Sequence, residues 1–430
     1  MFSGVRKSEV ALILCFLGII FAVPTAQTCI EIRRGQRVQA TDVFRTKPTA
    51  ANLREYERTL EEKSVFQQQL RPQMQHLLFA ALHDTGAKAI LGRGDWFFFR
   101  PDVRYVVEPD RLETGMGSSV WMVPSDHSTR RDSAVCAIVH FRDQLQQRGI
   151  QLLVVPVPGK PSVYPDKLTR RAAARDAESP TLGFIHDLRD RGIETVDLFA
   201  AFRAARGAVT GDPQLYLARD THWRPQGAAI AAATVGDRLR ELGWAPPVSR
   251  EFTTRARAVN RWGDVIDMMQ VPGLQHQFPP ERAQCTQVHD PAKGLLIPAA
   301  ADRPGAFKYP ARQSSVLVLG DSFSRIYQFA EPKSLGECLD PPDAAEKRTE
   351  TKHLLPGSAG FISHLALSLK APVDAIVSDG GASTDVRRRL STNPEILEGK
   401  TVVVWEFVER DLALGRQGWD DVLLPVKLGE

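Results

Sequence analysis

The sequence predicts an α/β fold with a central, mostly parallel sheet that helices cover on both faces. Two observations support this prediction. Short, almost continuous apolar runs rich in β-branched residues recur along the chain, and helical segments separate them. Strands of this kind are typical of parallel sheets that are buried on both sides. The runs are Gln151–Pro158, Glu194–Phe199, Ser314–Gly320, Val373–Ser378 and Lys400–Phe407.

The first element of the chain is an apolar segment. Arg6 and Lys7 precede the unbroken apolar run Val10–Val23, a pattern typical of a signal peptide. The stretch without charges continues to Ile30, and the run is followed by a poor cleavage site. If it stays uncut, it is long enough to span a bilayer with its basic end in the cytoplasm. We expect residues 1–30 to be a signal peptide or an N-terminal membrane anchor, and the rest to be periplasmic.

Residues 31–90 are predicted to form a helical N-terminal extension. Asn52–Leu70 is rich in Leu, Glu, Arg and Gln and contains neither Gly nor Pro, a composition that favours helix. After Gly86, the aromatic run Trp96–Phe99 is suited to a strand. We therefore place one α/β domain at residues 91–430.

The helices of this domain alternate with its strands. Pro225 is suited to the first turn of a helix that runs to about Leu242. In a sheet built in this way, the active site lies at the carboxyl ends of the strands. The other predicted helices are Asp132–Arg148, Leu182–Arg191, Gly360–Leu369 and Thr384–Leu390.

The composition excludes some classes of function without naming one. Of 430 residues, 43% are hydrophobic and 25% are charged, which is ordinary for a globular protein. A chain of this length can bury a core without relying on disulfides or a metal. The net charge of +4 is small and indicates no nucleic-acid partner.

The cysteines leave several pairings open. Beyond Cys15 of the apolar run, the chain contains Cys29, Cys136, Cys285 and Cys338. In an oxidising compartment these four allow three complete pairings, between which the sequence does not choose. We favour a Cys29–Cys285 bridge, which would tie the N-terminal segment to the domain. Cys136 lies in an apolar helical stretch, which is also typical of a buried free thiol.

The first motif that suggests chemistry is Gly320–Ser324, directly after a predicted strand. A serine at this place, Ser322, can expose its hydroxyl at the sheet edge, and its own N–H can face a developing oxyanion. The G-x-S-x-G elbow of hydrolases is not matched, because Ser324 stands at its last position. The alternative is that Asp321 or Ser322 only caps the following helix. Position alone does not decide between the two.

The second motif is the segment Asp220–Trp223, which leads into the helix that begins at Pro225. Residues two apart in an extended segment point to the same side. Asp220 can therefore orient His222, whose other ring nitrogen would then face a serine. A serine hydroxyl needs such a base, so this pair supplies what Ser322 lacks. The alternative is a solvent-exposed Asp-x-His in a loop.

Other patterns point to no metal or cofactor. Gly92-Arg93-Gly94 leads into a strand rather than a helix, which argues against a dinucleotide site. Cys285 and His289 have no second ligand pair at zinc spacing. We expect a protein that works without either group.

The motifs together resemble a known family. Asp220–Ala228 (DTHWRPQGA), followed by Val316–Phe323 (VLVLGDSF), is similar to the SGNH-hydrolase-like O-acetyltransferases that acetylate alginate and related exopolysaccharides. The resemblance extends over most of residues 90–412. Its further motifs are Leu91–Phe99, Pro156–Leu168, Gly263–Pro272, Ala359–Phe361, Asp379–Ser383 and Val404–Arg410.

This resemblance implies an SGNH-like three-layer fold with a circularly permuted order of motifs. It makes Ser322 the nucleophile, His222 the base and Asp220 the carboxylate that orients the base. The usual glycine and asparagine oxyanion donors have no clear counterparts. Gly380 and Gly381 are the candidates, with a plain turn as the alternative.

The same resemblance suggests residues that contact the substrate. Lys160, Tyr164, Arg325 and Tyr327 could line the cleft, although each also has an ordinary packing or surface explanation. Gln328–Pro356, which contains Cys338, resembles an insertion after the helix that follows the nucleophile.

The implied function is O-acetylation of an exported bacterial polysaccharide through an acetyl-serine intermediate. The acetyl donor partner would be a multipass membrane O-acyltransferase, because acetyl-CoA is not expected outside the cytoplasm. The acceptor would be the polysaccharide. Two alternatives stay open: an acetylesterase with the same triad, and a non-catalytic scaffold of an exopolysaccharide export complex.

Overall fold

The structure is a computed structural model. It describes residues 7–45, 47–108, 130–171, 178–207, 214–271, 273–291, 294–295, 314–329, 331, 333–340, 355–414 and 418–425. The chain divides into two compact units. The N-terminal unit comprises Met1–Gly86 with Gln270–Gly273, and the main unit comprises Ala87–Met269 with Leu274–Glu430.

The N-terminal unit is helical, and its first helix is strongly apolar. Within that helix, Val10–Arg33 has a mean hydropathy of 2.3 and is the one described segment long and apolar enough to cross a membrane. A signal sequence has the same properties, so this helix could be a signal anchor. The elements of the unit are α1 (Lys7–Arg33), η1 (Gln39–Phe44), α2 (Ala50–Lys63) and α3 (Val65–Leu82).

The continuous helix expected over residues 52–70 is interrupted at Ser64. This residue is extended, and its side chain accepts a hydrogen bond from the backbone N–H of Gln67. Serine is favoured at such a position because its hydroxyl satisfies an N–H that the first helical turn leaves without a partner. The result is two helices, α2 and α3, in place of one.

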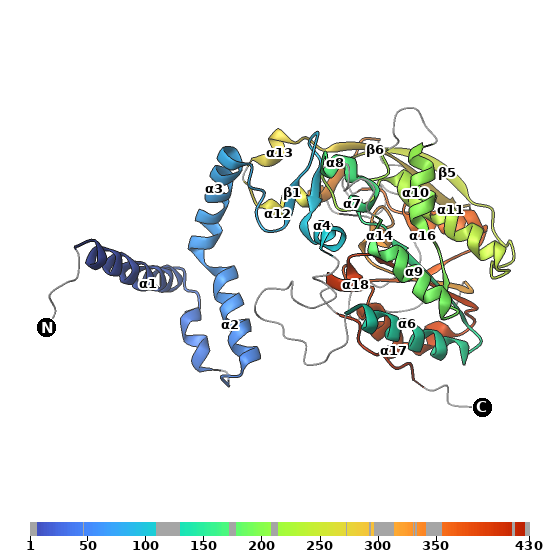
Figure 1. The fold of residues 1–430 in the computed structure, drawn as a ribbon, viewed down its shortest axis with the longest axis horizontal. Helices are drawn as coiled ribbons and strands as arrows, with labels where there is room; N and C mark the ends of the chain where they lie inside the picture. Colours follow the sequence, from blue (N-terminus) through green and yellow to red (C-terminus); the bar gives the residue numbers. More distant parts are fainter. Residues whose placement is uncertain are drawn as a thin grey trace. The chain divides into compact units, whose positions relative to one another are not determined.

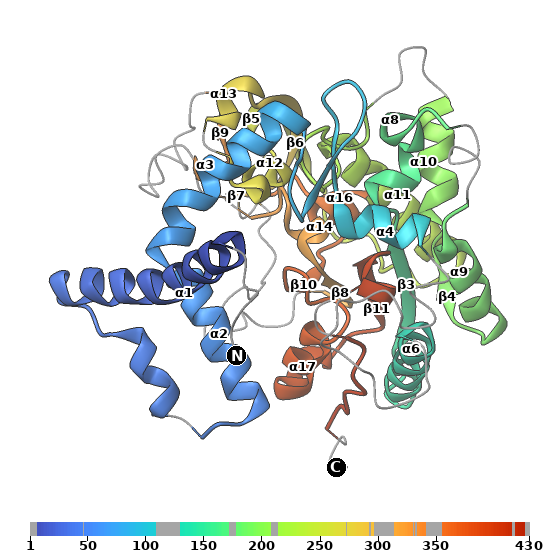
Figure 2. The ribbon, with the colours of Figure 1, turned by 60° about the vertical axis from the view of Figure 1, so that its left-hand side comes forward.

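The main unit is built on a parallel five-stranded sheet, as predicted. Its strand order is β10-β8-β11-β3-β4, and every neighbouring pair is parallel. Figure 2 shows β10, β8, β11 and β3 in this order. β4 is shorter than expected, because helix starts again at Leu198. The strands are β3 (Gln151–Val157), β4 (Glu194–Thr195), β8 (Val316–Gly320), β10 (Asp374–Val377) and β11 (Val402–Val408).

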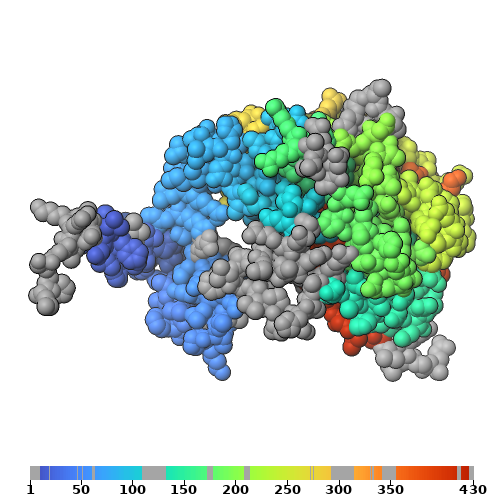
Figure 3. Space-filling view, in the orientation of Figure 1, coloured from blue at the N-terminus to red at the C-terminus, as the bar shows by residue number. Residues whose placement is uncertain are grey.

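Helices cover both faces of this sheet, and successive strand residues point to opposite faces. Leu153 and Val155 belong to one hydrophobic core, whereas Leu152 and Val154 belong to the other. The helices on the first side are α10 (Leu198–Gly207), α11 (Pro225–Glu241) and α16 (Phe361–Leu369). Those on the second are α6 (Arg130–Gln146), α9 (Pro180–Asp190) and α17 (Asp385–Thr392). In Figure 1, α10 and α11 lie above α6 and α17, and Figure 3 shows α6 and α9 side by side at the surface.

A second sheet was not predicted from the sequence. It is antiparallel, with the order β7-β6-β5-β9. Its two long strands carry many charged and polar residues, so they lack the apolar runs that identified the parallel sheet. Two of those charged residues, Arg257 and Arg261, are nevertheless buried. The strands are β5 (Thr253–Arg261), β6 (Glu281–Asp290), β7 (Gly294–Leu295) and β9 (Gly336–Cys338).

Short elements complete the main unit. The strand expected at residues 96–99 is present as β2, which forms a hairpin with β1. The short elements are β1 (Ala89–Leu91), β2 (Phe97–Phe99), α4 (Arg100–Val107), α7 (Lys160–Val163), α8 (Pro165–Leu168), α12 (Asp264–Met269), α13 (Leu274–Gln277), α14 (Ser322–Arg325), η3 (Lys333–Leu335), η4 (Pro394–Leu397) and α18 (Asp411–Leu414).

The structure gives no support to the cysteine predictions. All five thiols are free in it. Cys285 is enclosed within the first hydrophobic core, where burial raises the pKa of its thiol to about 12. Cys136 is exposed rather than buried, because it lies on the outer side of α6.

Candidate active site

The Gly320–Ser324 turn lies at the carboxyl end of β8, where α14 begins. Asp321 is the residue that caps this helix, since one of its carboxylate oxygens accepts from the backbone N–H of Phe323 at 2.8 Å. The other oxygen accepts from the N–H of Val408 at 2.9 Å. The capping role therefore belongs to Asp321, which leaves the hydroxyl of Ser322 available for other contacts.

The Asp220–Trp223 segment lies in the turn before α11, as expected. Leu215 and Arg224 close this turn, because the N–H of Arg224 donates to the carbonyl of Leu215 at 2.7 Å. Pro225 follows at the first helical position. Within the turn, the N–H of His222 donates to the carboxylate of Asp220 at 3.0 Å. The lead-in is therefore a bent turn rather than the extended segment that was expected, and this turn brings the side chains of Asp220 and His222 together.

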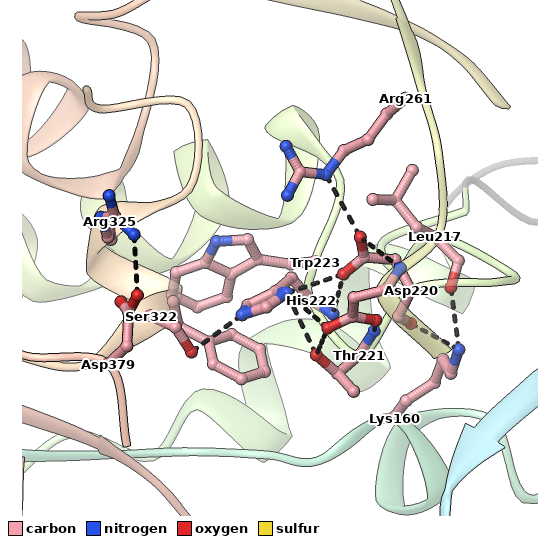
Figure 4. A network of polar contacts seen from close by, with 12 residues as sticks. Lys160, Leu217, Asp220, Thr221, His222, Trp223, Arg261, Ser322, Arg325 and Asp379 are labelled. Carbon is pink, nitrogen blue, oxygen red and sulfur yellow. Dashed lines mark hydrogen bonds and ion pairs between the residues drawn. The ribbon is translucent and has the colours of Figure 1, made fainter. Parts of the chain in front are cut away.

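The two motifs meet in one chain of hydrogen bonds, shown in Figure 4. His222 Nδ1 lies 2.6 Å from Asp220 Oδ1, and His222 Nε2 lies 2.8 Å from Ser322 Oγ. With Nδ1–H donating to the carboxylate, Nε2 accepts from the serine hydroxyl. The other oxygen of Asp220 accepts from Arg261 Nε at 3.2 Å.

Charge fixes the protonation of the carboxylate and the imidazole. Burial alone would raise the pKa of Asp220, but Arg261 and His222 outweigh it and hold that pKa well below its usual range. Burial would lower the pKa of His222, but the charge and hydrogen bond of Asp220 outweigh it and hold that pKa above 6.5. Such an imidazole is a stronger base than a free one.

Three of the predicted substrate contacts are wrong, because the residues are completely buried. Lys160, Tyr164 and Tyr327 are each 0% exposed. The Tyr164 hydroxyl accepts from the N–H of Leu215 at 2.7 Å, and the Tyr327 hydroxyl donates to the carbonyl of Trp223 at 3.3 Å. Both tyrosines therefore support the turn that carries His222.

Lys160 supports the same turn from the other side. Its ammonium donates to the backbone carbonyls of Leu217, Ala218 and Asp220 at 3.0, 3.0 and 2.6 Å. Burial lowers its pKa to about 8, although the nearby carboxylates of Glu281 and Asp264 oppose that shift. Lys160 thus holds the backbone of the turn that carries Asp220 and His222.

Arg325 is the remaining candidate for substrate contact. It ends α14, keeps 31% of its side chain exposed and lies 2.7 Å from Asp379 Oδ2. Figure 4 shows this ion pair beside Ser322. Arg325 is therefore the one predicted contact residue that the structure leaves at the surface next to the serine.

The two candidate oxyanion glycines differ. The N–H of Gly381 donates to the carbonyl of Ser378 at 2.9 Å, so it closes a turn and is not available; that prediction is wrong. Among the described residues, the amides of Gly380 and Ser322 donate to no protein acceptor. Gly380 has a φ of 62°, a conformation that favours glycine.

One group of side chains could in principle surround a cation. Ligand atoms of Asp220, His222 and Asp264 all lie within 4.8 Å of one another. Donors already point at the oxygens of this group, because Arg261 donates to Asp220 and Thr221 donates to Asp264. The contacts therefore describe a hydrogen-bonded network around the imidazole.

Sequence reasoning missed several residues of this network. Arg261 lies at the end of β5, in the sheet that was not predicted. Glu281 accepts from the N–H groups of Ala218 and Arg219 at 2.9 and 2.8 Å. Asp264 belongs to the Gly263–Pro272 motif, which carried the family resemblance but had no role assigned to it. That motif was the sequence signal from which a role for Asp264 could have been inferred.

Comparisons with known proteins agree with this architecture. The curated probable alginate O-acetylase AlgJ of Pseudomonas aeruginosa is 29% identical over 212 residues, which cover 49% of this chain and 48% of that protein. The probable alginate O-acetylase AlgJ of Pseudomonas fluorescens is 34% identical over 279 residues, which cover 64% of this chain and 60% of that protein. This chain thus spans about half the length of the first of these relatives.

The solved O-acetyltransferase domain of Pseudomonas putida AlgJ has the same fold. It superposes with a TM-score of 0.50 at 21% sequence identity, over 76% of this chain and 92% of that chain. The expected α/β fold is therefore confirmed. A family model described as "SGNH hydrolase-like domain, acetyltransferase AlgX" matches residues 90–342. The predicted resemblance is thereby confirmed as well, and the chain belongs to the family of SGNH hydrolase-like domains of the AlgX acetyltransferase type.

Proposed function

We propose that this chain is an O-acetyltransferase that moves acetyl groups onto hydroxyls of an exported polysaccharide. The observation that carries the proposal is the unbroken contact from Ser322 through His222 to Asp220, with distances of 2.8 and 2.6 Å. A serine, a base and a buried carboxylate in this arrangement perform acyl transfer in many unrelated folds.

In the first step, Ser322 Oγ attacks the carbonyl carbon of an acetyl donor while His222 Nε2 takes its proton. The bond to the leaving group then breaks, and the imidazolium returns the proton to that group. The amides of Ser322 and Gly380 are our candidates for stabilising the oxyanion, because neither is used elsewhere among the described residues. An acetyl ester on Ser322 remains.

The second step reverses the roles. A sugar hydroxyl attacks the acetyl-serine and gives its proton to His222. The ester bond to Ser322 breaks, and His222 returns the proton to the serine oxygen. Asp220 stays ionised throughout, because Arg261 and His222 hold its pKa low. Loss of a triad residue should lower the rate on the order of 10⁴-fold.

The setting of the reaction belongs to the same proposal. The apolar helix α1 would anchor the chain, with the main unit in the periplasm. There the donor would be a multipass membrane O-acyltransferase that passes acetyl groups across the bilayer. Two curated relatives are named as probable alginate O-acetylases, which makes alginate or a related polymer the first acceptor to test.

The direct test is to incubate the purified protein with a soluble acetyl ester and oligosaccharides of the candidate polymer, and to identify the products by mass spectrometry. We expect acetylated oligosaccharide, and none with Ser322→Ala. Free acetate without acetylated sugar would instead assign an acetylesterase. If Ser322→Ala left polymer acetylation unchanged in cells, the chain would be a scaffold.

A further inference from the structure

The carboxylate of Asp264, which is outside the triad, accepts hydrogen bonds from the turn that carries Asp220 and His222. Asp264, the first residue of α12, accepts the backbone N–H of Thr221 on one oxygen at 2.7 Å and the Thr221 hydroxyl on the other at 2.6 Å. Its own N–H approaches Asp220 Oδ2 at 3.4 Å. Since Thr221 stands between Asp220 and His222, these contacts fix the segment that carries both.

The same carboxylate lies close to the imidazole. Asp264 Oδ2 is 3.5 Å from His222 Nδ1, and Thr221 Oγ1 is 3.1 Å from that nitrogen. The single hydroxyl proton of Thr221 goes to Asp264, so the hydroxyl oxygen presents its lone pairs to Nδ1–H. A protonated His222 therefore has two carboxylates beside it. Asp220 accepts directly from Nδ1–H, and Asp264 lies further away, with the Thr221 hydroxyl between them.

The approach of Asp264 depends on the glycine before it. A Cβ added to Gly263 would lie 2.1 Å from the carbonyl oxygen of Arg219. Only a residue without a side chain lets the start of α12 pack this closely against the turn. The contact is thus built into the backbone of both segments.

The two carboxylates near the imidazole differ in their partners. Asp220 is partly neutralised by Arg261, which also pairs with Glu331 at 2.6 Å. Asp264 makes no ion pair with Arg261, and the ammonium of Lys160 is committed to backbone carbonyls. The charge of Asp264 acts on both His222 and Lys160, and in each case it favours the protonated form.

We propose that Asp264 is a positioning residue for the acyl transfer. Through Thr221 it holds the turn that carries Asp220 and His222, and its charge stabilises the protonated imidazole that forms in each step. This inference rests on the proposed function, because it assigns Asp264 a part in the same reaction.

The test is the pH dependence of kcat/KM for a chromogenic acetyl ester in Asp264→Asn. The matched control is Asp267→Asn, which removes an exposed carboxylate from the same short helix. We expect Asp264→Asn to lower kcat/KM about tenfold, as one pKa unit of interaction implies. Its acidic limb should move to lower pH, because a negative charge beside His222 is lost. The control should change neither quantity.

Thr221 provides a second variant that does not alter charge. Thr221→Val should lower kcat/KM, because it removes the hydroxyl that donates to Asp264 and leaves only the backbone N–H contact. Thr221→Ser should restore most of the loss, because serine keeps the hydroxyl. Asp264→Asn should then lower kcat/KM by a smaller factor in the Thr221→Val background than in the native chain. A shared loss of folding would instead appear as a lower Tm in both Thr221 variants.

Two results overturn the inference. One is an Asp264→Asn enzyme whose rate and acidic limb match those of Asp267→Asn; the other is additive loss in the double variant. His222→Ala separates this failure from that of the proposed function. If His222→Ala is inactive while Asp264→Asn is unaffected, only the inference about Asp264 fails. If His222→Ala stays active, the proposed function itself fails.

Discussion

At the scale of single residues, the site depends on how charges compensate one another. Arg261 keeps Asp220 ionised although only 1% of that side chain is exposed. Asp220 in turn raises the pKa of His222 against the effect of burial. Burial, followed by repulsion from Asp220, raises the pKa of Asp264 to about 6. The pKa of each of these groups thus reflects burial together with the charge of a named neighbour.

A pH profile tests this arrangement. His222 must be neutral to take a proton from Ser322, so kcat/KM should rise as the pH passes through the pKa of His222. Because that pKa is raised, the acidic limb should lie above pH 6.5. Asp220 should add no limb near neutrality, since its pKa is held far lower. A limb at or below pH 6.5 in the native enzyme would contradict the proposed charge balance.

The triad residues could be proposed from the sequence because local rules place them. Asp220 and His222 are two apart in the lead-in to a predicted helix, and Ser322 follows a buried strand. The supporting residues could not be placed in this way. Lys160 looks like a surface cation in the sequence, yet its ammonium is buried against backbone carbonyls contributed by a turn far along the chain. Only tertiary contacts assign that role.

At the scale of elements, the turn after β8 is held by close packing. A Cβ added to Gly320 would lie 2.4 Å from Ser324 Oγ and 2.8 Å from Glu406 Oε2. Those two side chains already share a hydrogen bond of 2.5 Å. The strand and the start of α14 thus fit together only when position 320 has no side chain.

Gly320→Ala should therefore destabilise the fold by about 1–3 kcal/mol, as overpacking of a filled core does. It should also slow acyl transfer, because Ser322 lies two residues further on. Urea unfolding and kcat/KM would measure the two effects. The matched control is Gly207→Ala at the end of α10, where an added Cβ meets nothing within 4 Å. Equal unfolding free energies for the two variants would refute the packing account.

The elements differ in how well the sequence predicts them. The parallel strands were predicted because burial on both faces demands continuous apolar runs, as in β11. β5 and β6 were missed because their charged residues hide the pattern; Arg261 is buried in β5 only because Glu331 and Asp220 pair with it. An ion pair between distant segments leaves no periodic signal in the sequence.

At the scale of the whole molecule, both hydrophobic cores consist of residues of the main unit, from Trp96 to Leu424. The catalytic residues proposed above lie in the same unit. The main unit therefore contains both the packing and the chemistry that the account requires.

A chain that begins at Ala87 should consequently fold and react with acetyl esters at close to the rate of the full chain. Calorimetry and kcat/KM on the truncated protein would check this. Loss of cooperative melting would show that the N-terminal unit is needed for folding. Loss of activity in a cooperatively folded truncation would show that it is needed for the chemistry.

The central claim is that His222 activates Ser322. Its most direct test is the reaction of the native protein with a fluorophosphonate, followed by mass spectrometry of the labelled peptide. The account predicts labelling at Ser322, and loss of that labelling in a folded His222→Ala variant. Labelling at another serine, or undiminished labelling of Ser322 without His222, would contradict it.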